Sequence, residues 1–197
     1  MEGLRRHPVA LLIDYARWQM ATARMTEKMF WEILGLFDWS KTSDDDAVLA
    51  PALRKLAKMS ASDIERFDDL LAEKLHALDT REHARHMFEG EADVDDGDDY
   101  ISADGFLYGR CVVVANGRDF YNVVLLDPSK TPKGMEFESL LYLASMAFEK
   151  KTKGEYDHSS PVDYESFSNK EGWAPTPKTR PGRFTGKNIP PGNRRPT

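Results

Sequence analysis

The fold class of this chain depends on its most apolar stretch, which runs from Ser102 to Lys130. Two β-branched runs, Val112–Val114 and Val123–Val124, flank an Asn116-Gly117 step, and this pattern is typical of a β-hairpin with a two-residue turn. A two-stranded hairpin is only marginally stable by itself, and we find no third segment with strand character. The sequence therefore predicts either an isolated hairpin or a wholly helical protein.

The same stretch is also compatible with two short helices. Apolar side chains recur at helical spacing from Phe106 to Val114, and Asn116-Gly117 would then end the first helix as a C-cap. A second helix would stop before Asp127-Pro128, because a residue that precedes proline disfavours the helical conformation. Local rules leave both alternatives open.

Apolar residues recur at helical spacing in most of the remaining chain. Thr26 is expected to cap one helix, and Ser62 with Glu65 has the spacing of a capping box for another. Pro51 is expected near the first turn of its helix, where a missing N–H costs little. The segments expected to contain these helices are residues 8–24, 25–37, 43–59, 60–88 and 134–154.

The composition is that of a soluble domain with appendages. The chain has 197 residues, of which 41% are hydrophobic and 30% charged, so it can bury a sizeable core. One cysteine excludes an intramolecular disulfide framework and fits a reducing cytosol. The apolar run Val9–Ile13 is far shorter than the roughly 20 residues that a membrane helix needs. We therefore expect a cytoplasmic protein without a membrane partner.

Charge is distributed unevenly along the chain. The net charge is −6, yet residues 174–197 hold six basic side chains and no acidic one, so the remainder carries 21 basic and 33 acidic residues, or −12. Many prolines and glycines at this end predict a flexible basic C-terminal arm. The expected organisation is an N-terminal helical extension (1–24), a helical domain (25–156) and a Pro/Gly-rich basic tail (157–197).

Three histidines and an acidic loop are candidate metal ligands, but neither completes a known ligand set. His76, His83 and His86 would share one side of a long helix, without the further ligand that a zinc site requires. In the acidic loop, counted from Asp93, acids occupy positions 1, 3, 7 and 12 of a possible calcium loop, namely Asp93, Asp95, Asp99 and Asp104. An aspartate nevertheless stands at position 6, where an EF-hand requires glycine. We expect no metal site.

Motifs of catalysis and cofactor binding are not found in the sequence. Cys111 is flanked by apolar residues and is expected to be a buried, inert thiol. The chain has no Gly-x-Ser-x-Gly nucleophile motif, no phosphate-binding loop and no dinucleotide fingerprint. We therefore assign no catalytic residue and no cofactor, and whether the protein is an enzyme stays open.

Arg110 is the residue of greatest interest, because a guanidinium among apolar neighbours must reach water or a polar partner. It could pair with Asp104, Asp119 or Asp127 and fix the packing of two short helices. Alternatively, it could face a groove and bind an acidic ligand or partner. The candidate binding residues for that role are Asp104, Arg110, Arg118 and Asp127.

Residues from Met25 to about Tyr156 resemble a bacterial family known as domain of unknown function 4240. The segments that carry the resemblance are MTEKMFWEIL, SASDIERFDDLL, DGFLYGRCVVVANGRDFYNVVLLDPS and ESLLYLASMAFEKKTKG. Two positions depart from the family pattern, since Gly109 stands where the family has Phe and Val112 where it has Trp. The resemblance implies two helices in the central stretch, and hence an all-α domain of five to six helices. It implies no activity.

The leading hypothesis is a non-enzymatic binding or regulatory protein, for example an accessory or immunity-like partner of another protein. An acidic body is suited to a basic partner, and a basic tail could become ordered on contact. One alternative is an enzyme of unknown reaction with its site around Arg110 and Arg118. The other is nucleic-acid contact through the tail alone, because phosphates require cations that the acidic body lacks.

Overall fold

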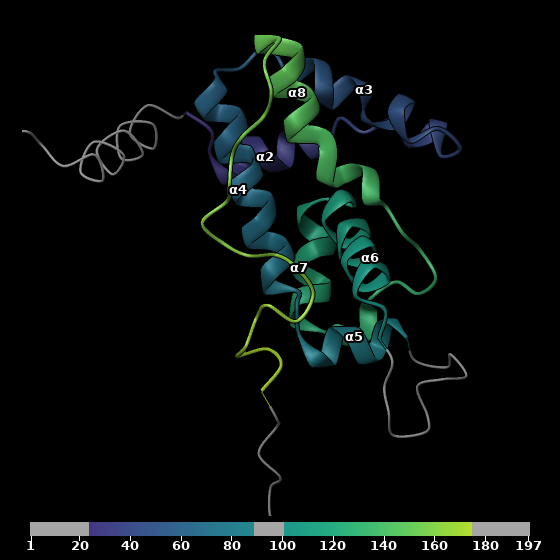
Figure 1. Ribbon diagram of the computed structural model, residues 1–197. Helices are drawn as coiled ribbons and strands as arrows, with labels where there is room; N and C mark the ends of the chain where they lie inside the picture. Colours follow the sequence, from purple (N-terminus) through teal and green to yellow (C-terminus); the bar gives the residue numbers. More distant parts are fainter. Residues whose placement is uncertain (1–23, 89–100, 175–197) are drawn as a thin grey trace, which may run out of the picture.

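The computed structural model describes residues 24–88 and 101–174 (Figure 1). In these two ranges the protein is all-α, with seven α-helices, three short 3-10 helices and no strand. This confirms the expected fold class, with one helix more than the five to six expected. The elements are α2 (Glu27–Leu34), η1 (Trp39–Lys41), α3 (Asp45–Leu56), α4 (Ala61–Ala77), α5 (Arg81–Met87), α6 (Ala103–Ala115), α7 (Arg118–Leu126), η2 (Pro128–Lys130), η3 (Glu138–Tyr142) and α8 (Leu143–Thr152).

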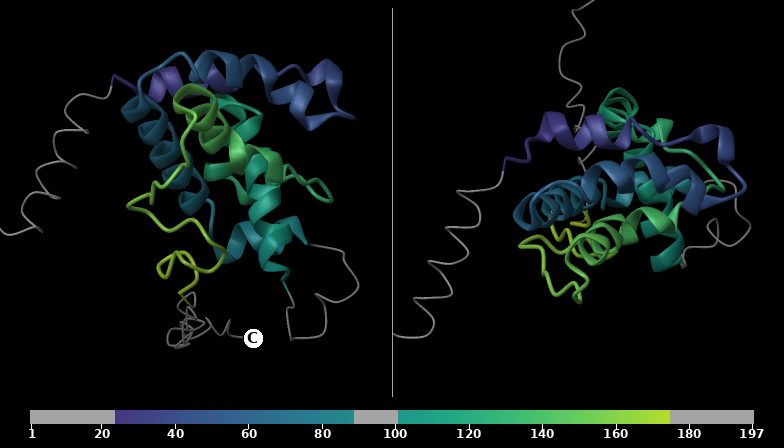
Figure 2. Two further views of the ribbon diagram at one scale, coloured as in Figure 1. Left: turned by 45° about the horizontal axis from the view of Figure 1, so that its top comes forward. Right: turned by 90° about the horizontal axis from the view of Figure 1, so that it is seen from above.

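Helix α4 is the longest of the described elements, and α2, α6 and α8 are arranged around it. Helices α2, α6 and α8 all pack against it, and α8 also packs against α3. Both views of Figure 2 show α8 beside α4, and Figure 1 shows α6 and α7 below them. The core contains aromatic rings in contact, such as Phe30 with Phe67 at a centroid distance of 4.9 Å. None of the described helices is long and apolar enough to cross a membrane.

The central apolar stretch forms two helices, α6 and α7, as the resemblance implied. Helix α6 is buried on nearly all sides, with nine of its 13 residues inside the core. A helix buried all round has a continuous apolar run, which is why local rules could not distinguish it from strands. Gly117 has a φ of 90° at the N-cap of α7, so the Asn116-Gly117 step joins two helices and needs glycine.

Two local expectations about helix ends are wrong. The capping box of α4 is formed by Ser60 and Asp63, two residues before the expected pair of Ser62 and Glu65. Asp63 is the better partner because its carboxylate also accepts a hydrogen bond from the Met25 backbone N–H at 2.8 Å. Pro51 lies in the middle of α3 rather than near its first turn.

Gly109 differs from the family pattern, and its surroundings explain how the core accommodates the difference. A Cβ atom at this position would lie 2.3 Å from the Met87 sulfur. Met87 of α5 therefore fills the space next to α6 that a larger side chain would need. Methionine suits this role because its unbranched side chain adapts to irregular gaps.

The chain beyond α8 follows the body of the protein without regular secondary structure. We call residues 153–174 the strap. Figures 1 and 2 show it in yellow-green, leaving the end of α8, passing along α4 and ending near α5. Residues 157–174 fall in the range that the sequence assigned to a tail, yet they are tied to the helices by the hydrogen bonds described below. Residues 175–197 lie outside the described residues.

Candidate binding site

Among the described residues, Arg110 of α6 is the largest fully buried side chain, with 1% of its surface exposed. Its Nη1 donates hydrogen bonds to the carbonyl oxygens of Leu75, at 2.8 Å, and Tyr164, at 3.0 Å. Its Nη2 donates to the Ser166 hydroxyl at 2.9 Å. The guanidinium also lies over the Phe106 ring, 4.7 Å from its centroid. Arg110 thus joins α4, α6 and the strap.

The expected pairing of Arg110 with Asp104, Asp119 or Asp127 is wrong. Among the described residues no carboxylate forms an ion pair with its guanidinium. Burial lowers the pKa of Arg110, and the negative charge of nearby Asp79 opposes this effect. The Leu75 carbonyl belongs to the last turn of α4, where the helix dipole places partial negative charge. The positive charge of Arg110 is therefore balanced by the C-terminal end of α4 and by the carboxylate of Asp79, which does not contact the guanidinium directly.

Asp79, directly after α4, is a second buried charge that binds the strap and is completely inaccessible to solvent. One carboxylate oxygen accepts hydrogen bonds from the Phe167 backbone N–H at 3.0 Å and the Trp173 indole N–H at 2.8 Å. The other accepts from the Asn169 backbone N–H at 2.9 Å and the Ser168 hydroxyl at 3.4 Å. Four donors of the strap thus converge on one side chain, which sequence reasoning did not single out.

The first half of the strap is held by a polar cluster on α4. His158 Nε2 lies 2.8 Å from the carboxylate of Asp69, and the Tyr156 hydroxyl donates to Asp68 at 3.0 Å. The hydrogen bond to Asp69 raises the pKa of His158, whereas burial raises the pKa of Asp68. A protonated His158 therefore binds the strap to α4 more strongly than a neutral one.

This arrangement predicts a pH-dependent contribution of His158 to stability. Because its pKa is raised in the folded state, the contribution is fully present below the ordinary histidine pKa of about 6.5. It is lost as the pH rises through the raised value. In urea unfolding series from pH 5.5 to 9, we expect His158→Gln to be less stable than the wild type at low pH. The difference should shrink as the pH rises, and a constant difference would contradict the prediction.

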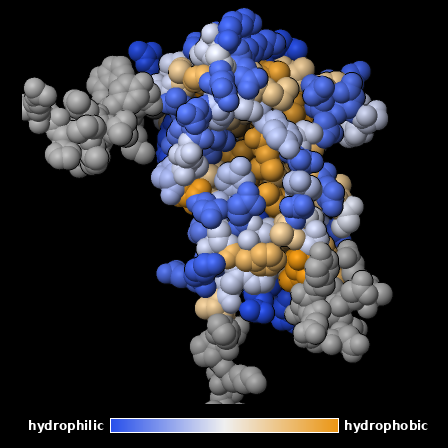
Figure 3. Space-filling model, in the orientation of Figure 1, coloured by the Kyte–Doolittle hydropathy of each residue, from blue (hydrophilic) through white to orange (hydrophobic). Residues whose placement is uncertain are grey.

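The strap, α6 and the segment η3–α8 enclose a groove of about 410 Å³, which we call the tyrosine groove. Its lining includes four tyrosines and four carboxylates, and no lysine or arginine among the described residues that form it. Figure 3 shows apolar side chains at the centre of the face that carries the strap, framed by hydrophilic residues. The groove is lined by Asp68, Asp104, Leu107, Tyr108, Glu138, Leu141, Tyr142, Ser145, Tyr156, His158, Tyr164 and Glu165.

The tyrosines of the groove are surrounded by negative charge. The Tyr142 hydroxyl donates to Glu138 at 2.6 Å, and this bond raises the pKa of Tyr142. Burial, with Asp68 and Glu165 nearby, raises the pKa of Tyr164. The hydroxyls of Tyr142 and Tyr156 thus point to carboxylates, while the ring of Tyr142 is half exposed. Ring faces and carboxylates together attract cations.

The four residues proposed from the sequence do not meet in one place. Asp104, at the start of α6, lines the tyrosine groove, whereas Arg110 is buried beneath the strap. Arg118 and Asp127 are exposed at opposite ends of α7. Asp127 accepts two hydrogen bonds from Ser129 and thereby caps η2. A binding role for these residues stays a prediction, and only Asp104 lies in a cavity described here.

His76 and His83 bind different parts of the chain. His76 Nδ1 lies 2.7 Å from the Asp163 carbonyl of the strap, while buried His83 contacts the Val124 carbonyl at 3.1 Å and the Thr80 hydroxyl at 2.7 Å. Within the described ranges no group of His, Cys, Asp or Glu side chains is arranged to hold a metal ion. Eight of the twelve positions of the possible calcium loop, residues 93–100, lie outside the described residues.

Cys111 is fully buried in the core, as expected, and burial raises its pKa to about 12. The thiol therefore stays protonated at neutral pH and is a poor nucleophile.

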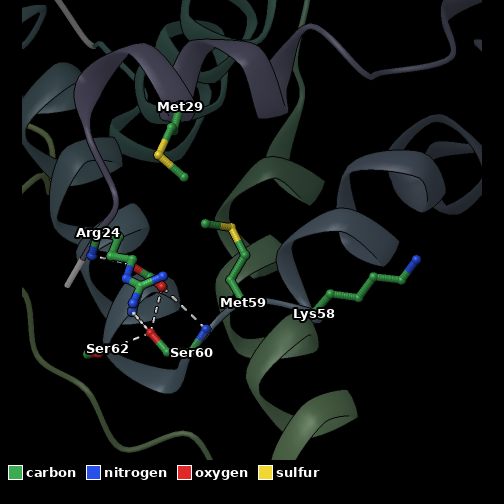
Figure 4. A pocket seen from close by; sticks show the side chains of 7 residues that line it. Arg24, Met29, Lys58, Met59, Ser60 and Ser62 are labelled. Atoms are coloured by element: carbon green, nitrogen blue, oxygen red, sulfur yellow. Dashed lines mark hydrogen bonds between the residues drawn. The ribbon is translucent and has the colours of Figure 1, made fainter. Parts of the chain in front are cut away.

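A second groove lies between α2 and the turn that joins α3 to α4 (Figure 4). Its volume is about 520 Å³, and its lining combines two methionines with two basic side chains, two serines and the carboxylate of Asp63. Figure 4 shows Met29 and Met59 pointing toward each other across the groove, whereas Lys58 points away. Arg24 at its edge is the first described residue, so part of the chain next to this groove lies outside the described residues.

The described residues thus define an all-α protein in which a C-terminal strap completes a tyrosine-lined, carboxylate-rich groove. Residues 25–150 match the model of the family described as Protein of unknown function (DUF4240), and the chain belongs to this family. The resemblance found in the sequence is confirmed. No curated protein and no solved structure matches the chain. The strap lies beyond the matched residues, although Arg110, which binds it, lies within them.

Proposed function

We propose that the protein is a non-enzymatic binding protein that takes up a cationic segment of another protein in the tyrosine groove. The observation that carries this proposal is the lining of the groove, which combines four carboxylates with four tyrosines and holds no lysine or arginine among the described residues. Carboxylates bind ammonium and guanidinium groups, and tyrosine faces bind the same cations through their π-electrons.

The size and exposure of the groove agree with a peptide as ligand. Tyr142 has 51% of its surface exposed, and the ring can therefore be covered by a partner. Aromatic residues supply much of the binding energy in protein interfaces because their rings bury a large area at low entropic cost. Carboxylates beside them select a positive partner and repel nucleic-acid phosphates.

The enzyme alternative centred on Arg110 and Arg118 has less support. Arg110 uses its guanidinium to hold the carbonyls of Leu75 and Tyr164 and the hydroxyl of Ser166. Arg118 lies exposed on α7, on the other side of the Asn116-Gly117 step. The two arginines therefore do not point into a common cavity where a substrate could contact both.

Calorimetric titration of the full chain with a ten-residue Lys/Arg/Gly peptide tests the proposal. We expect binding that weakens as salt is added, and no binding of a Glu/Gly peptide of the same length. Glu138→Gln should weaken binding about tenfold, because a charge-assisted hydrogen bond contributes about 1.5–3 kcal/mol in a partly desolvated site. Glu149→Gln, which removes an exposed charge of α8 outside the groove, is the matched control. If Glu138→Gln and Glu149→Gln bound the peptide with equal affinity, the peptide would bind outside the tyrosine groove.

A further inference from the structure

We propose that the tyrosine groove also binds the protein's own basic C-terminal segment, Lys178 to Arg195, so that a partner must displace it. This inference rests on the proposed function, since it concerns the same groove and the same chemistry of recognition. The segment is then the occupant of the groove in the free protein, and cationic ligands must compete with it for the same site.

Charge is the first argument for this occupant. The groove presents four carboxylates, one each from α4, α6, η3 and the strap. Residues 174–197 contain no acidic side chain, and the other residues of the chain carry a net charge of −12. The basic side chains of the segment are Lys178, Arg180, Arg183, Lys187, Arg194 and Arg195. The segment carries six positive charges, and the four carboxylates of the groove outnumber its one histidine, His158, so the two surfaces are complementary in sign.

The amino-acid composition of the segment is the second argument. The sequence PTPKTRPGRFTGKNIPPGNRRPT alternates prolines with basic residues. Proline-rich segments favour the polyproline II conformation, which docks in grooves lined by aromatic rings at a small entropic cost. Basic residues next to the prolines then meet carboxylates at the edges of such a groove. The tyrosine groove offers both kinds of contact, whereas the groove of Figure 4 has no aromatic side chain and only one carboxylate, that of Asp63, in its lining.

The third argument is reach. The strap residues Tyr156, Tyr164 and Glu165 form part of the groove, and the segment continues from the end of the same strap at Ala174. An extended chain covers about 3.3 Å per residue, so the roughly 20 residues to Arg195 span up to about 70 Å. A domain of this size is only about 40 Å across. Tethering gives the segment an effective concentration in the millimolar range, sufficient to occupy even a weak site.

The test uses the full chain and a variant in which the six basic residues of the segment are replaced by glutamine. The probe is a fluorescent synthetic peptide with the sequence of residues 176–188, TPKTRPGRFTGKN, and its affinity is measured by anisotropy. We expect the six-glutamine variant to bind the probe about tenfold more tightly than the wild type. This factor follows if the probe and the tethered segment both bind the groove with a Kd of about 0.1 mM, and if the effective concentration of the tethered segment is about 1 mM.

The possible results separate this inference from the proposed function. Equal binding of the probe by both proteins would overturn the inference and leave the cationic groove intact. No binding of the probe by either protein would overturn both. Glu138→Gln, introduced into the six-glutamine variant, should reduce probe binding, and an unchanged affinity would show that the segment binds another surface. If the wild type formed a dimer and the six-glutamine variant did not, the segment would bind the groove of a second copy of the chain. This result would contradict the intramolecular contact.

Discussion

Replacing Arg110 with alanine is expected to lower the free energy of unfolding by about 3–5 kcal/mol. The guanidinium donates short hydrogen bonds to the buried carbonyls of Leu75 and Tyr164, and each charge-assisted bond of this kind contributes about 1.5–3 kcal/mol. Removal of the stem also leaves a cavity beside Phe106 in the core. Denaturation by urea, followed by circular dichroism, measures the effect.

Two further variants separate the hydrogen bonds of Arg110 from its packing. Arg110→Met retains much of the stem but no donor, so we expect a loss almost as large as that of alanine. Arg85→Ala in α5 is the matched control, because this arginine is exposed and should change stability by no more than about 0.5 kcal/mol. If Arg110→Ala kept the wild-type denaturation midpoint and lost only ligand binding, Arg110 would be a ligand-binding residue instead.

The strap connects the stability of the protein to the tyrosine groove. Tyr164 lines the groove with its side chain and accepts the Arg110 hydrogen bond with its carbonyl. The hydroxyl of Ser166, two residues further, accepts a hydrogen bond from Arg110 Nη2. The same hydroxyl donates to the Ala103 carbonyl at the start of α6. A variant that releases the strap should therefore lose ligand binding as well as stability. Glu138→Gln should lose ligand binding alone.

The helices were largely predictable because their signals are local. The apolar spacing around Phe67 in α4 and the N-cap of Thr26 depend on residues within a few turns of one another. The central stretch was ambiguous because burial of α6 on all sides removes the amphipathic pattern. Tertiary packing of α6 against α4 and α7 decides between helices and a hairpin, and only the family resemblance indicated that outcome beforehand.

The site could not be predicted in the same way, because its contacts join distant parts of the chain. Arg110 and Tyr164 are separated by 54 residues, and Asp79 and Trp173 by 94. Two partners of Arg110 are backbone carbonyl groups, which every residue has, so no pattern of side chains in the sequence predicts them. One signal was available, namely the aromatic residues in a serine-rich, polar stretch from Tyr156 to Trp173. Large aromatic side chains seldom stay exposed in a solvated tail.

Asp79→Asn should release the strap at a cost of about 2–4 kcal/mol. The carboxylate accepts two hydrogen bonds on each oxygen, from the donors of Phe167, Ser168, Asn169 and Trp173. An asparagine amide has one oxygen, so either orientation turns its NH₂ group against at least one backbone N–H donor. A loss of 3 kcal/mol raises the population of the released strap about 100-fold. Limited trypsin digestion should therefore cleave after Lys170 correspondingly faster.

Asp157→Asn makes the same chemical change at an exposed position of the strap, and its digestion rate should equal that of the wild type. Equal rates for Asp79→Asn as well would show that Asp79 does not hold the strap. The charges of Asp79 and Arg110 attract each other across the site, and both side chains bind strap residues between Tyr164 and Trp173. Combining Asp79→Asn with Arg110→Met should therefore cost less than the sum of the two single changes, because a strap released by one change has no more contacts to lose through the other.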